Sequence, residues 1–392
     1  MNANKIFFIT NHRSFFLSHI FQHANKLRRK DNFSVELICG RDASSIMRSI
    51  ATKKLNFEKI KLRQFNFHPT SINPILDFKA FYQILFFLKK KKPKILHVAT
   101  PKGIVFGGLA GLFLGLPTII FFSGMGFFFL QDLKFKYKLI KYFYFFLLRI
   151  IFFNKKKYII VENKDDFNFF HKKFAINKSR LFLIKGSGVL AKSFIKNKIN
   201  LKKKTILFPG RVLRDKGIVE FLTAANNLVR EFPKWKFIVA GTLDYKKNSN
   251  IDQENILKLN FNNAVKFIGY QKNMVRIYKN STFVCLPSYR EGLSKALSEA
   301  AMSGLPIITS KAPGCKESII NKFTGELVIA SSVVSLTNKI RKFILNKKLL
   351  IRYGKNAKIF AKNNFDNLLI FSDIKKIYLK IIEDEKINID RT

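Results

Sequence analysis

Residues 282–319 read TFVCLPSYREGLSKALSEAAMSGLPIITSKAPGCKESI. The run TFVCLPS is apolar and is closed by Pro and Ser, as expected of a buried parallel strand. A helix is predicted from about Ser294 to Gly304, because glycine is the usual residue where a helix ends in the left-handed conformation. The run LPIITS is then a second buried strand. The stretch predicts one strand–helix–strand unit of an open α/β sheet.

Two carboxylates in this stretch are not required by such a fold. Glu291 follows the strand, and Glu299 comes eight residues later. Ligands of open parallel sheets bind outside the carboxyl ends of the strands, where Glu291 is expected. The amides of Gly292, Leu293 and Ser294 start the helix and favour an anion. Two interpretations fit: a site that also holds sugar hydroxyls, or a capping Glu291 with a solvated Glu299.

Apolar strands alternate with helical segments along the whole chain, which predicts doubly wound parallel sheets. The 392 residues suffice for two domains. A basic segment without clear periodicity predicts a linker at 191–204. We expect Rossmann-like domains over 1–190 and 205–375 that face a central cleft, and a helix end with a polar tail over 376–392. The predicted strands are 5–10, 34–40, 57–65, 94–100, 117–123, 158–163, 180–188, 205–211, 236–241, 265–270, 282–288, 305–310 and 325–328.

Charge and cysteine content limit the function classes. The net charge of +47 favours an anionic partner such as a phosphorylated substrate, an anionic lipid or a nucleic acid. Three cysteines, Cys39, Cys285 and Cys315, form no disulfide framework and lack metal-ligand spacing. The apolar run at the N-terminus is too short for a signal peptide. These features predict a cytoplasmic protein.

Residues 103–130 contain no charged side chain, so hydropathy alone makes them a transmembrane candidate. We interpret them instead as a glycine-rich helix that Pro117 ends, followed by the buried strand 117–123. Segment 133–153 has a different pattern, typical of a basic amphipathic helix on an anionic membrane surface. The alternative is a helix packed on the core with a solvated basic face. At about 100° per residue, four basic side chains fall within roughly 80°: Lys134, Lys138, Lys141 and Arg149.

A second candidate site element is PGRVLRDKG, residues 209–217. It places Arg211 at a strand's carboxyl end and Lys216 at the start of a helix, so both can hold a diphosphate. Surface basic residues in a basic protein are the alternative. The glycine turns 240–244 and 268–270 open toward the same edge. The sequence has no complete G-x-G-x-x-G, Walker A, D-x-D or H-E-x-x-H motif, so we expect no metal cofactor.

These residues resemble a known family. The spacing of Arg211, Lys216-Gly217 and Glu291-x7-Glu299 is similar to the nucleotide-sugar site of retaining family 4 glycosyltransferases, whose two Rossmann-like domains form the GT-B fold. The resemblance covers nearly the whole chain in the right order. The segments 11–20, 97–111, 123–129, 185–189, 286–300 and 303–319 resemble the branch that acts on undecaprenyl-diphosphate-linked sugars, with N-acetylgalactosaminyltransferases and other N-acetylhexosaminyltransferases among its members.

The resemblance implies roles for individual residues. Arg211 and Lys216 would hold the diphosphate of a UDP-sugar, Glu299 the ribose hydroxyls, and Glu291 the transferred sugar. The implied catalytic residues are Glu291, Arg211, Lys216 and His97. The implied donor-binding residues are Gly210, Arg211, Lys216, Gly217, Gly241, Gly292, Leu293, Ser294 and Glu299. The implied acceptor-side residues, in the first domain, are Asn11, Ser14, Thr100, Lys102, Ser123 and Gly124.

Three positions depart from the family pattern. Ala99 stands where many members have a second histidine, which weakens a catalytic role for His97. Ser294 replaces a common Pro, and Leu190 a common Asp.

The predicted function is transfer of a sugar, expected to be an N-acetylhexosamine, from a UDP-sugar to a polyprenyl-diphosphate-linked saccharide, with retention and without a metal. Such an enzyme would build cell-surface or glycoprotein glycans as a peripheral protein on the inner face of the bacterial cell membrane. The alternatives are a UDP-sugar epimerase of the same fold and a polyanion-binding protein. The chain lacks a recognisable nucleic-acid module, so nucleic acid is not an expected partner.

Overall fold

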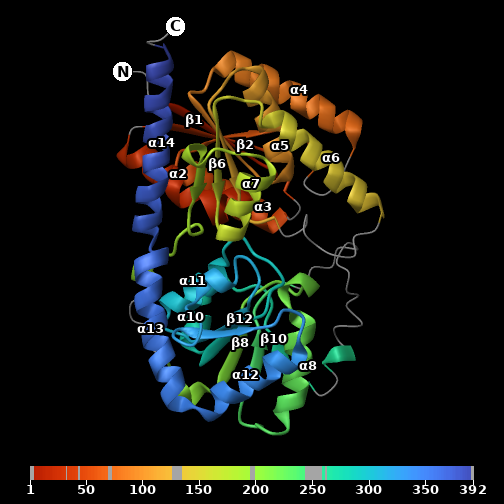
Figure 1. The fold of residues 1–392 in the computed structure, drawn as a ribbon, viewed down its shortest axis with the longest axis vertical. Coiled ribbons are helices and arrows are strands. Elements are labelled where there is room, and N and C mark those ends of the chain that lie inside the picture. Colours follow the sequence, from red (N-terminus) through yellow and green to blue (C-terminus); the bar gives the residue numbers. More distant parts are fainter. Residues whose placement is uncertain are drawn as a thin grey trace. The chain divides into compact units, whose positions relative to one another are not determined.

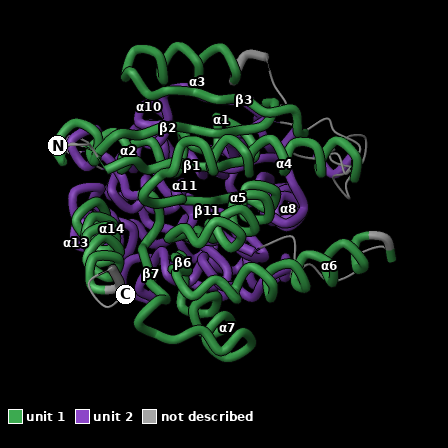
Figure 2. Tube along the Cα trace, turned by 90° about the horizontal axis from the view of Figure 1, so that it is seen from above, with its two compact units in different colours: residues 1–123, 127–187, 370–392 green, residues 124–126, 188–369 purple. Residues whose placement is uncertain are grey.

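The structure is a computed structural model, and it describes residues 4–31, 33–42, 45–68, 73–125, 135–194, 199–242, 258–260 and 263–389. The chain divides into two compact units, coloured separately in Figure 2. The first unit comprises residues 1–123, 127–187 and 370–392, and the second comprises residues 124–126 and 188–369. Each unit is built on one sheet and is described by itself; the domain boundaries expected from the sequence stay a prediction.

The sheet of the first unit is parallel throughout, in the order β3-β2-β1-β4-β5-β6-β7. The chain order changes direction between the neighbouring strands β1 and β4, which is the topological switch point of a Rossmann-like sheet. The strands are β1 (Lys5–Thr10), β2 (Ser34–Cys39), β3 (Lys61–Gln64), β4 (Ile95–Ala99), β5 (Thr118–Phe122), β6 (Lys157–Val161) and β7 (Leu181–Leu183).

Helices cover both faces of this sheet, as right-handed crossovers require (Figure 1). Alternate side chains of β1 show the two faces: the ring of Phe8 lies 5.4 Å from that of Phe16, whereas Phe7 stacks on Phe87 at 5.9 Å. The Phe8 face is covered by α1 (Arg13–Phe15), the π-helix η1 (Phe16–Ile20) and α2 (Phe21–Lys30). The Phe7 face is covered by α4 (Pro74–Lys91), α5 (Pro101–Phe113), α6 (Phe135–Ile151) and α7 (Lys164–Lys173).

Helix α5 lies unusually close to the sheet because glycines face it. A Cβ on Gly103 would come within 2.7 Å of the Ile9 carbonyl oxygen, and one on Gly107 or Gly111 would overlap Val98 or Thr118. The described part of the uncharged segment is therefore a buried helix followed by the central strand β5, as predicted. Within the described residues, no helix is long and apolar enough to cross a bilayer.

Several predicted boundaries in the first unit were wrong. The strand expected over 180–188 is only Leu181–Leu183. The strand expected over 57–65 is only Lys61–Gln64, because helix α3 (Ser45–Phe57) continues through Phe57 and Lys59 then adopts a left-handed φ of 52°. Helix α4 extends to Lys91 and ends at Lys92, which has a left-handed φ of 43°. Its lysines stabilise the last turn by facing the negative end of the helix dipole.

The second unit repeats the switch-point topology. Its parallel strands follow the order β10-β9-β8-β11-β12-β13, with β8 and β11 at the switch point. The strands are β8 (Thr205–Phe208), β9 (Lys236–Val239), β10 (Val265–Phe267), β11 (Phe283–Leu286), β12 (Ile307–Ser310) and β13 (Gly325–Val328). The main helices are α8 (Ile218–Val229), α10 (Met274–Lys279), α11 (Lys295–Met302), α12 (Val333–Leu345) and α13 (Lys347–Phe365).

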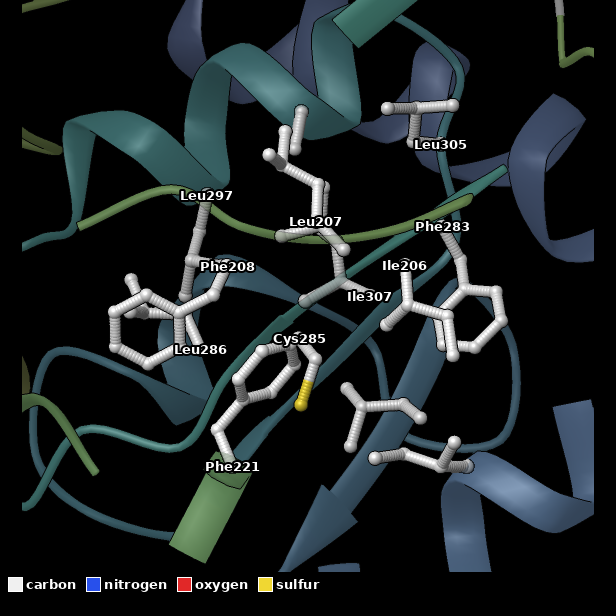
Figure 3. Packing of buried hydrophobic residues seen from close by; sticks show 14 of the residues in the cluster. Ile206, Leu207, Phe208, Phe221, Phe283, Cys285, Leu286, Leu297, Leu305 and Ile307 are labelled. Carbon is white, nitrogen blue, oxygen red and sulfur yellow. The ribbon is translucent and has the colours of Figure 1, made fainter. Parts of the chain in front are cut away.

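The core of the second unit fixes the two central strands against their helices (Figure 3). Phe208 of β8 packs on Phe221 of α8 with ring centroids 5.2 Å apart, and Leu286 of β11 and Leu297 of α11 belong to the same buried cluster. Burial of these side chains holds the carboxyl ends of β8 and β11 in place. The loops that follow both strands therefore start from rigid positions.

The last helix, α14 (Asn367–Ile389), returns to the first unit from Ile370 onward. Ile374, Tyr378 and Ile381 are buried in the core of that unit. At the end of the helix, Lys156 Nζ pairs with Glu385 Oε2 at 2.5 Å, and the Tyr158 hydroxyl donates to Asp384 at 2.7 Å. Helix α14 thus completes the core of the first unit with its apolar side and forms polar contacts near Glu385.

Candidate functional site

The candidate site of the second unit lies at its switch point. β8 and β11 are hydrogen-bonded neighbours, and the loops that leave their carboxyl ends carry 209–217 and 287–294. At this point the chain turns to opposite sides of the sheet, which leaves room for a ligand. The sequence-predicted Arg211, Lys216 and Glu291 all belong to these two loops.

Lys216 and Glu291 form the central ion pair. Lys216 Nζ lies 2.8 Å from Glu291 Oε2, and the two side chains are 15% and 14% exposed. Burial acts to lower the pKa of Lys216, but the carboxylates of Glu291 and Asp215 outweigh it, so the pKa is raised. The ammonium therefore stays charged at neutral pH. A half-buried cation held by one carboxylate can still donate to an anionic ligand, because an ammonium has three donors.

Backbone contacts lock the two loops together around this pair. Lys216 ends a 3-10 turn, η6 (Arg214–Lys216), and helix α8 starts only after Gly217, whose φ is 76°. The helix start predicted at about Lys216 is thus two residues early. A Cβ on Gly217 would lie 2.7 Å from Cγ of Pro287, so this position requires glycine for space and for conformation.

A third loop, after β12, supports Glu291 from its backbone side. The Glu291 amide donates to the Pro313 carbonyl at 3.0 Å. Gly314 has a φ of 75°, and a Cβ there would overlap the carbonyls of Glu291 and Gly292. The Gly314 amide donates to Glu317 at 2.8 Å. Sequence reasoning gave this loop no role, although the run APG between a strand and a polar turn was the available signal.

Tyr289, in the loop after β11, also connects the two loops. Its hydroxyl donates to Glu220 Oε1 at 2.6 Å, and its amide donates to the Asp215 carbonyl at 2.8 Å. Burial, with the Glu220 carboxylate, raises the pKa of Tyr289 to about 12. Glu220 is buried in the first turn of α8. Sequence reasoning missed both residues, because a hydrogen bond between residues so far apart in the chain leaves no local pattern.

Glu299 occupies a separate position on α11. The Tyr278 hydroxyl, which also donates to the Ala296 carbonyl at 2.9 Å, lies 3.4 Å from Glu299 Oε2. Burial raises the pKa of Glu299, although the Lys295 charge and the Tyr278 hydroxyl act in the opposite direction. The site therefore holds two carboxylates in different settings: Glu291 is paired with a cation, and Glu299 is beside a neutral hydroxyl.

The remaining donor-side residues line the loop ends. Arg211 is exposed, and its charge acts to lower the pKa of the nearby Lys216. A Cβ on Gly241 would overlap the Gly210 carbonyl, so the loops after β8 and β9 pack directly. Ser294 is the N-cap residue of α11, as the sequence predicted. Gly292 and Leu293 are buried just before it.

Three acceptor-side residues meet at the switch point of the first unit. The Asn11 amide donates to Thr100 Oγ1 at 2.7 Å, and Asn11 Oδ1 accepts from the amides of Lys102 and Gly103 at 3.0 Å each. Asn11 Oδ1 also accepts from Thr100 Oγ1 at 2.8 Å. Thr100 has a φ of 68°, a strained conformation for a β-branched residue. The Asn11 side chain thus satisfies the first amides of α5.

The other acceptor-side residues lie around this network. Lys102 Nζ pairs with Asp77 Oδ1 at 2.6 Å, and Ser14 Oγ is 2.6 Å from His12 Nδ1. Ser123 is partly exposed after β5. Gly124 is counted with the second unit and has a φ of 116°; a Cβ there would lie 2.7 Å from the Gly292 nitrogen. Of the segment 123–129 that resembles the family, residues from Gly126 onward are outside the described residues, as is Lys134.

His97 is buried within β4 on the face of the sheet that α14 covers. Its Nδ1 lies 2.5 Å from the Tyr378 hydroxyl, and its ring lies 5.1 Å from that of Phe8. Burial, with the nearby His23, lowers the pKa of His97 to about 3, so the imidazole is neutral. This setting is that of a core histidine. The catalytic role inferred from the resemblance stays a prediction.

Comparisons with known proteins identify the class. Two family models match: "Glycosyl transferase 4-like" over residues 5–161 and "Glycosyl transferases group 1" over residues 191–360. Together they span most of the chain. The chain belongs to the glycosyltransferases.

Two curated relatives match most of their own length. The first, from Campylobacter jejuni, is an N,N'-diacetylbacillosaminyl-diphospho-undecaprenol alpha-1,3-N-acetylgalactosaminyltransferase. It is 27% identical over 350 residues, which cover 85% of this chain and 89% of that protein. The second, from Escherichia coli, is a UDP-Gal:alpha-D-GlcNAc-diphosphoundecaprenol alpha-1,3-galactosyltransferase, 25% identical and covering 80% and 82% of the two chains. This chain is thus similar to glycosyltransferases that act on undecaprenyl-diphosphate-linked sugars.

Solved structures confirm the fold. A glycosyltransferase from Rickettsia africae superposes with a TM-score of 0.74 at 20% identity, covering 97% of this chain and 99% of that one. Anabaena Alr3699/HepE, crystallised with UDP, gives a TM-score of 0.74 at 15% identity, covering 96% and 100%. The predicted architecture of two Rossmann-like parallel-sheet domains, the GT-B fold, is confirmed.

Proposed function

We propose that the protein transfers a sugar from a UDP-sugar to a polyprenyl-diphosphate-linked saccharide, with retention of the anomeric configuration. The observation that supports this proposal best is the cluster at the β8/β11 switch point, where Lys216 is held at 2.8 Å by Glu291 beside the exposed Arg211. The similarity to the Campylobacter jejuni transferase supports the acceptor class and an N-acetylhexosamine as the sugar. The products belong to cell-surface or glycoprotein glycan assembly.

The donor's diphosphate is the group that the cationic side chains suit. Arg211 presents a planar fork for two phosphate oxygens, and Lys216 presents a compact charge. In the transfer step the bond between the anomeric carbon and the UDP oxygen breaks. Arg211 and Lys216 stabilise the negative charge that develops on that oxygen, without a metal ion. The acceptor hydroxyl oxygen forms the new bond to the anomeric carbon, and its proton passes to the departing diphosphate.

The other donor residues orient the nucleotide and the sugar. Glu299 accepts from the ribose hydroxyls, and Glu291 accepts from a sugar hydroxyl while it keeps Lys216 in place. The amides of Gly292 and Leu293 lie at the start of α11, where the helix dipole favours the distal phosphate. The rigid backbone network through Pro313 and Tyr289 supports this assignment, because such a site depends on fixed geometry.

The acceptor is assigned to the first unit. Asn11, Ser14, Thr100 and Lys102 supply amide, hydroxyl and ammonium groups at its switch point, and Ser123 follows β5. Gly124, the next residue, is counted with the second unit and is assigned to the acceptor side as well. These neutral and singly charged groups suit sugar hydroxyls and one phosphate. Because the acceptor carries a polyprenyl chain, we place the working enzyme on the inner face of the cell membrane as a peripheral protein.

The test is UDP release from a panel of UDP-sugars, with and without a lipid-linked sugar acceptor. We expect release that requires one particular donor and the acceptor together, and that persists in excess EDTA. Conversion of a UDP-sugar without acceptor would instead indicate an epimerase. Absence of UDP binding would contradict the assignment of the β8/β11 switch point.

A further inference from the structure

Helix α6 exposes an apolar face that its sequence alone does not reveal. Tyr144, Leu148 and Ile151 are buried and fix the core-facing side. At about 100° per residue, the exposed apolar residues lie within an arc of roughly 100° on the opposite side. Five of them are 53–76% exposed: Phe135, Leu139, Tyr142, Phe143 and Phe146.

Helix α4 has the same arrangement. Its core side consists of Ala80, Ile84 and Leu88. The opposite side carries a row of rings in which Phe78 and Tyr82 are 6.5 Å apart and Tyr82 and Phe86 are 4.4 Å apart. Four apolar residues within roughly 80° of one another are 50–80% exposed: Ile75, Phe78, Tyr82 and Phe86.

The two helices belong to one layer of the first unit, with α5 between them (Figures 1 and 2). Helix α5 contributes Phe113, which is 64% exposed and lies 6.3 Å from Phe81 of α4. Soluble proteins rarely expose apolar side chains over several helices of one layer. Where they do, the patch marks an interaction site. We call the exposed apolar residues of α4, α5 and α6 the aromatic face.

Basic residues border the aromatic face, and no acidic residue of α4 or α6 is exposed beside them. On α4 these are Lys79, Lys89 and Lys90, and on α6 they are Lys138 and Arg149, all of them exposed. The one acidic side chain of either helix, Asp77, is paired with Lys102 at 2.6 Å. Aromatic rings beside lysines suit the boundary between lipid headgroups and acyl chains, where apolar burial and attraction to anionic lipids act together.

We propose that the aromatic face is the surface by which this protein docks on an anionic lipid bilayer, with α4 and α6 both lying in the headgroup region. The inference rests on the proposed function for its biological setting, since a polyprenyl-linked acceptor is held in a membrane. It adds the location and composition of the docking surface, and it includes α4, which sequence periodicity does not single out. The charge of the bordering lysines favours a bilayer over a second copy of this basic chain.

The experiment is flotation of the full chain with vesicles of phosphatidylcholine, with or without phosphatidylglycerol. We expect binding to the anionic vesicles, reduced about tenfold by Tyr82→Ser with Phe86→Ser and about tenfold by Tyr142→Ser with Phe146→Ser. Lys89→Gln, Lys90→Gln and Lys138→Gln together should weaken it about 100-fold. The matched control, Phe57→Ser with Leu379→Ser, removes exposed apolar side chains of α3 and α14 and should bind like the wild type.

Sedimentation and an activity assay distinguish failure of this inference from failure of the proposed function. If the α4 substitutions leave vesicle binding unchanged, or the control weakens it equally, the inference is wrong. Sedimentation tests for a dimer. If the wild-type chain is a dimer that the double variant Tyr142→Ser, Phe146→Ser dissociates, and the chain does not bind vesicles, then the aromatic face is an interface between two copies of the chain. Transfer to a water-soluble, short-chain acceptor tests the proposed function alone, and the aromatic-face variants should retain it.

Discussion

The two units share the strand order around the switch point, but different side chains occupy that point. In the first unit, the Asn11 side chain fills the position between β1 and β4 and accepts hydrogen bonds from the first amides of α5. In the second unit, the equivalent position between β8 and β11 holds the cation Lys216 with Glu291 as its partner. The Asn11 side chain is neutral and its oxygen is satisfied by the protein itself, so it offers no charge to the diphosphate of the donor. The second keeps charged donors available, because an ammonium bound to one carboxylate retains two further protons.

The different side chains at the two switch points show how the same topology can suit two different ligands. The fold provides a helix N-terminus at each switch point, and in the first unit the Asn11 side chain accepts from the first amides of that helix. Four experiments test the contrast, beginning with the largest expected effect.

Glu291→Gln should lower kcat/KM for transfer about 1000-fold, because Lys216 loses its orienting charge and the sugar loses an acceptor. Circular dichroism should show an unchanged fold. The control is Glu231→Gln, which removes the carboxylate of an exposed ion pair with Arg341 in the same unit. It should change kcat/KM less than about twofold. Near-normal transfer by Glu291→Gln would place the reaction elsewhere.

Asn11→Ala should destabilise the first unit by about 3 kcal/mol, because the buried amides of Lys102 and Gly103 lose their acceptor. Hydrogen exchange of β1 and β4 amides measures this loss. The affinity for UDP should be unaltered if the diphosphate binds the second unit. The control Asn56→Ala changes an exposed asparagine of α3 and should leave exchange as it is. Weaker UDP binding with normal exchange would reverse the contrast.

Arg211→Ala should weaken UDP binding about tenfold, measured by calorimetry, since one charge-assisted contact is lost. The free energy of unfolding should change by less than about 0.5 kcal/mol, because the side chain is exposed. Arg230→Ala removes another exposed arginine of this unit and serves as control. Equal UDP affinity in the two variants would remove Arg211 from the site.

The smallest effect concerns pH and His97. The pKa of His97 is lowered to about 3 in the folded chain, below its ordinary value of about 6.5. The unfolded chain therefore binds the extra proton first, so stability falls as the pH drops below about 6.5. Between pH 7 and 5.5 this group should cost about 1 kcal/mol, and His97→Gln should remove that part of the slope.

The same variant decides what His97 does. His23 and Tyr378 face the imidazole, so a Tyr378→Phe variant should be compared in the same denaturant series. A role in packing predicts normal kcat at neutral pH with His97→Gln. A large loss of kcat with unchanged stability would establish the catalytic role that the resemblance implies.

Local sequence predicted those parts of the fold that depend on local pattern. Strands such as TFVCLPS and LPIITS are apolar throughout because both of their faces are covered, and Gly304 ends α11 where predicted. The end of α3 and the start of β3 were harder, since Phe57 fits a helix as well as a strand. The sequence also predicted Lys216 and Glu291 as candidate site residues, because they are charged residues that follow apolar strands.

By itself, then, the sequence determined the two doubly wound parallel sheets and the charged residues that follow β8 and β11. The strand order, and with it each switch point, came from the structure. Only the tertiary structure decided which of these groups pair, that Asn11 closes one helix N-terminus, that His97 is buried against α14, and that α4 and α6 leave aromatic rings exposed. The physical reason is the same in each case. Periodicity states which residues share a face of an element, but burial and hydrogen bonding depend on what distant segments place against that face.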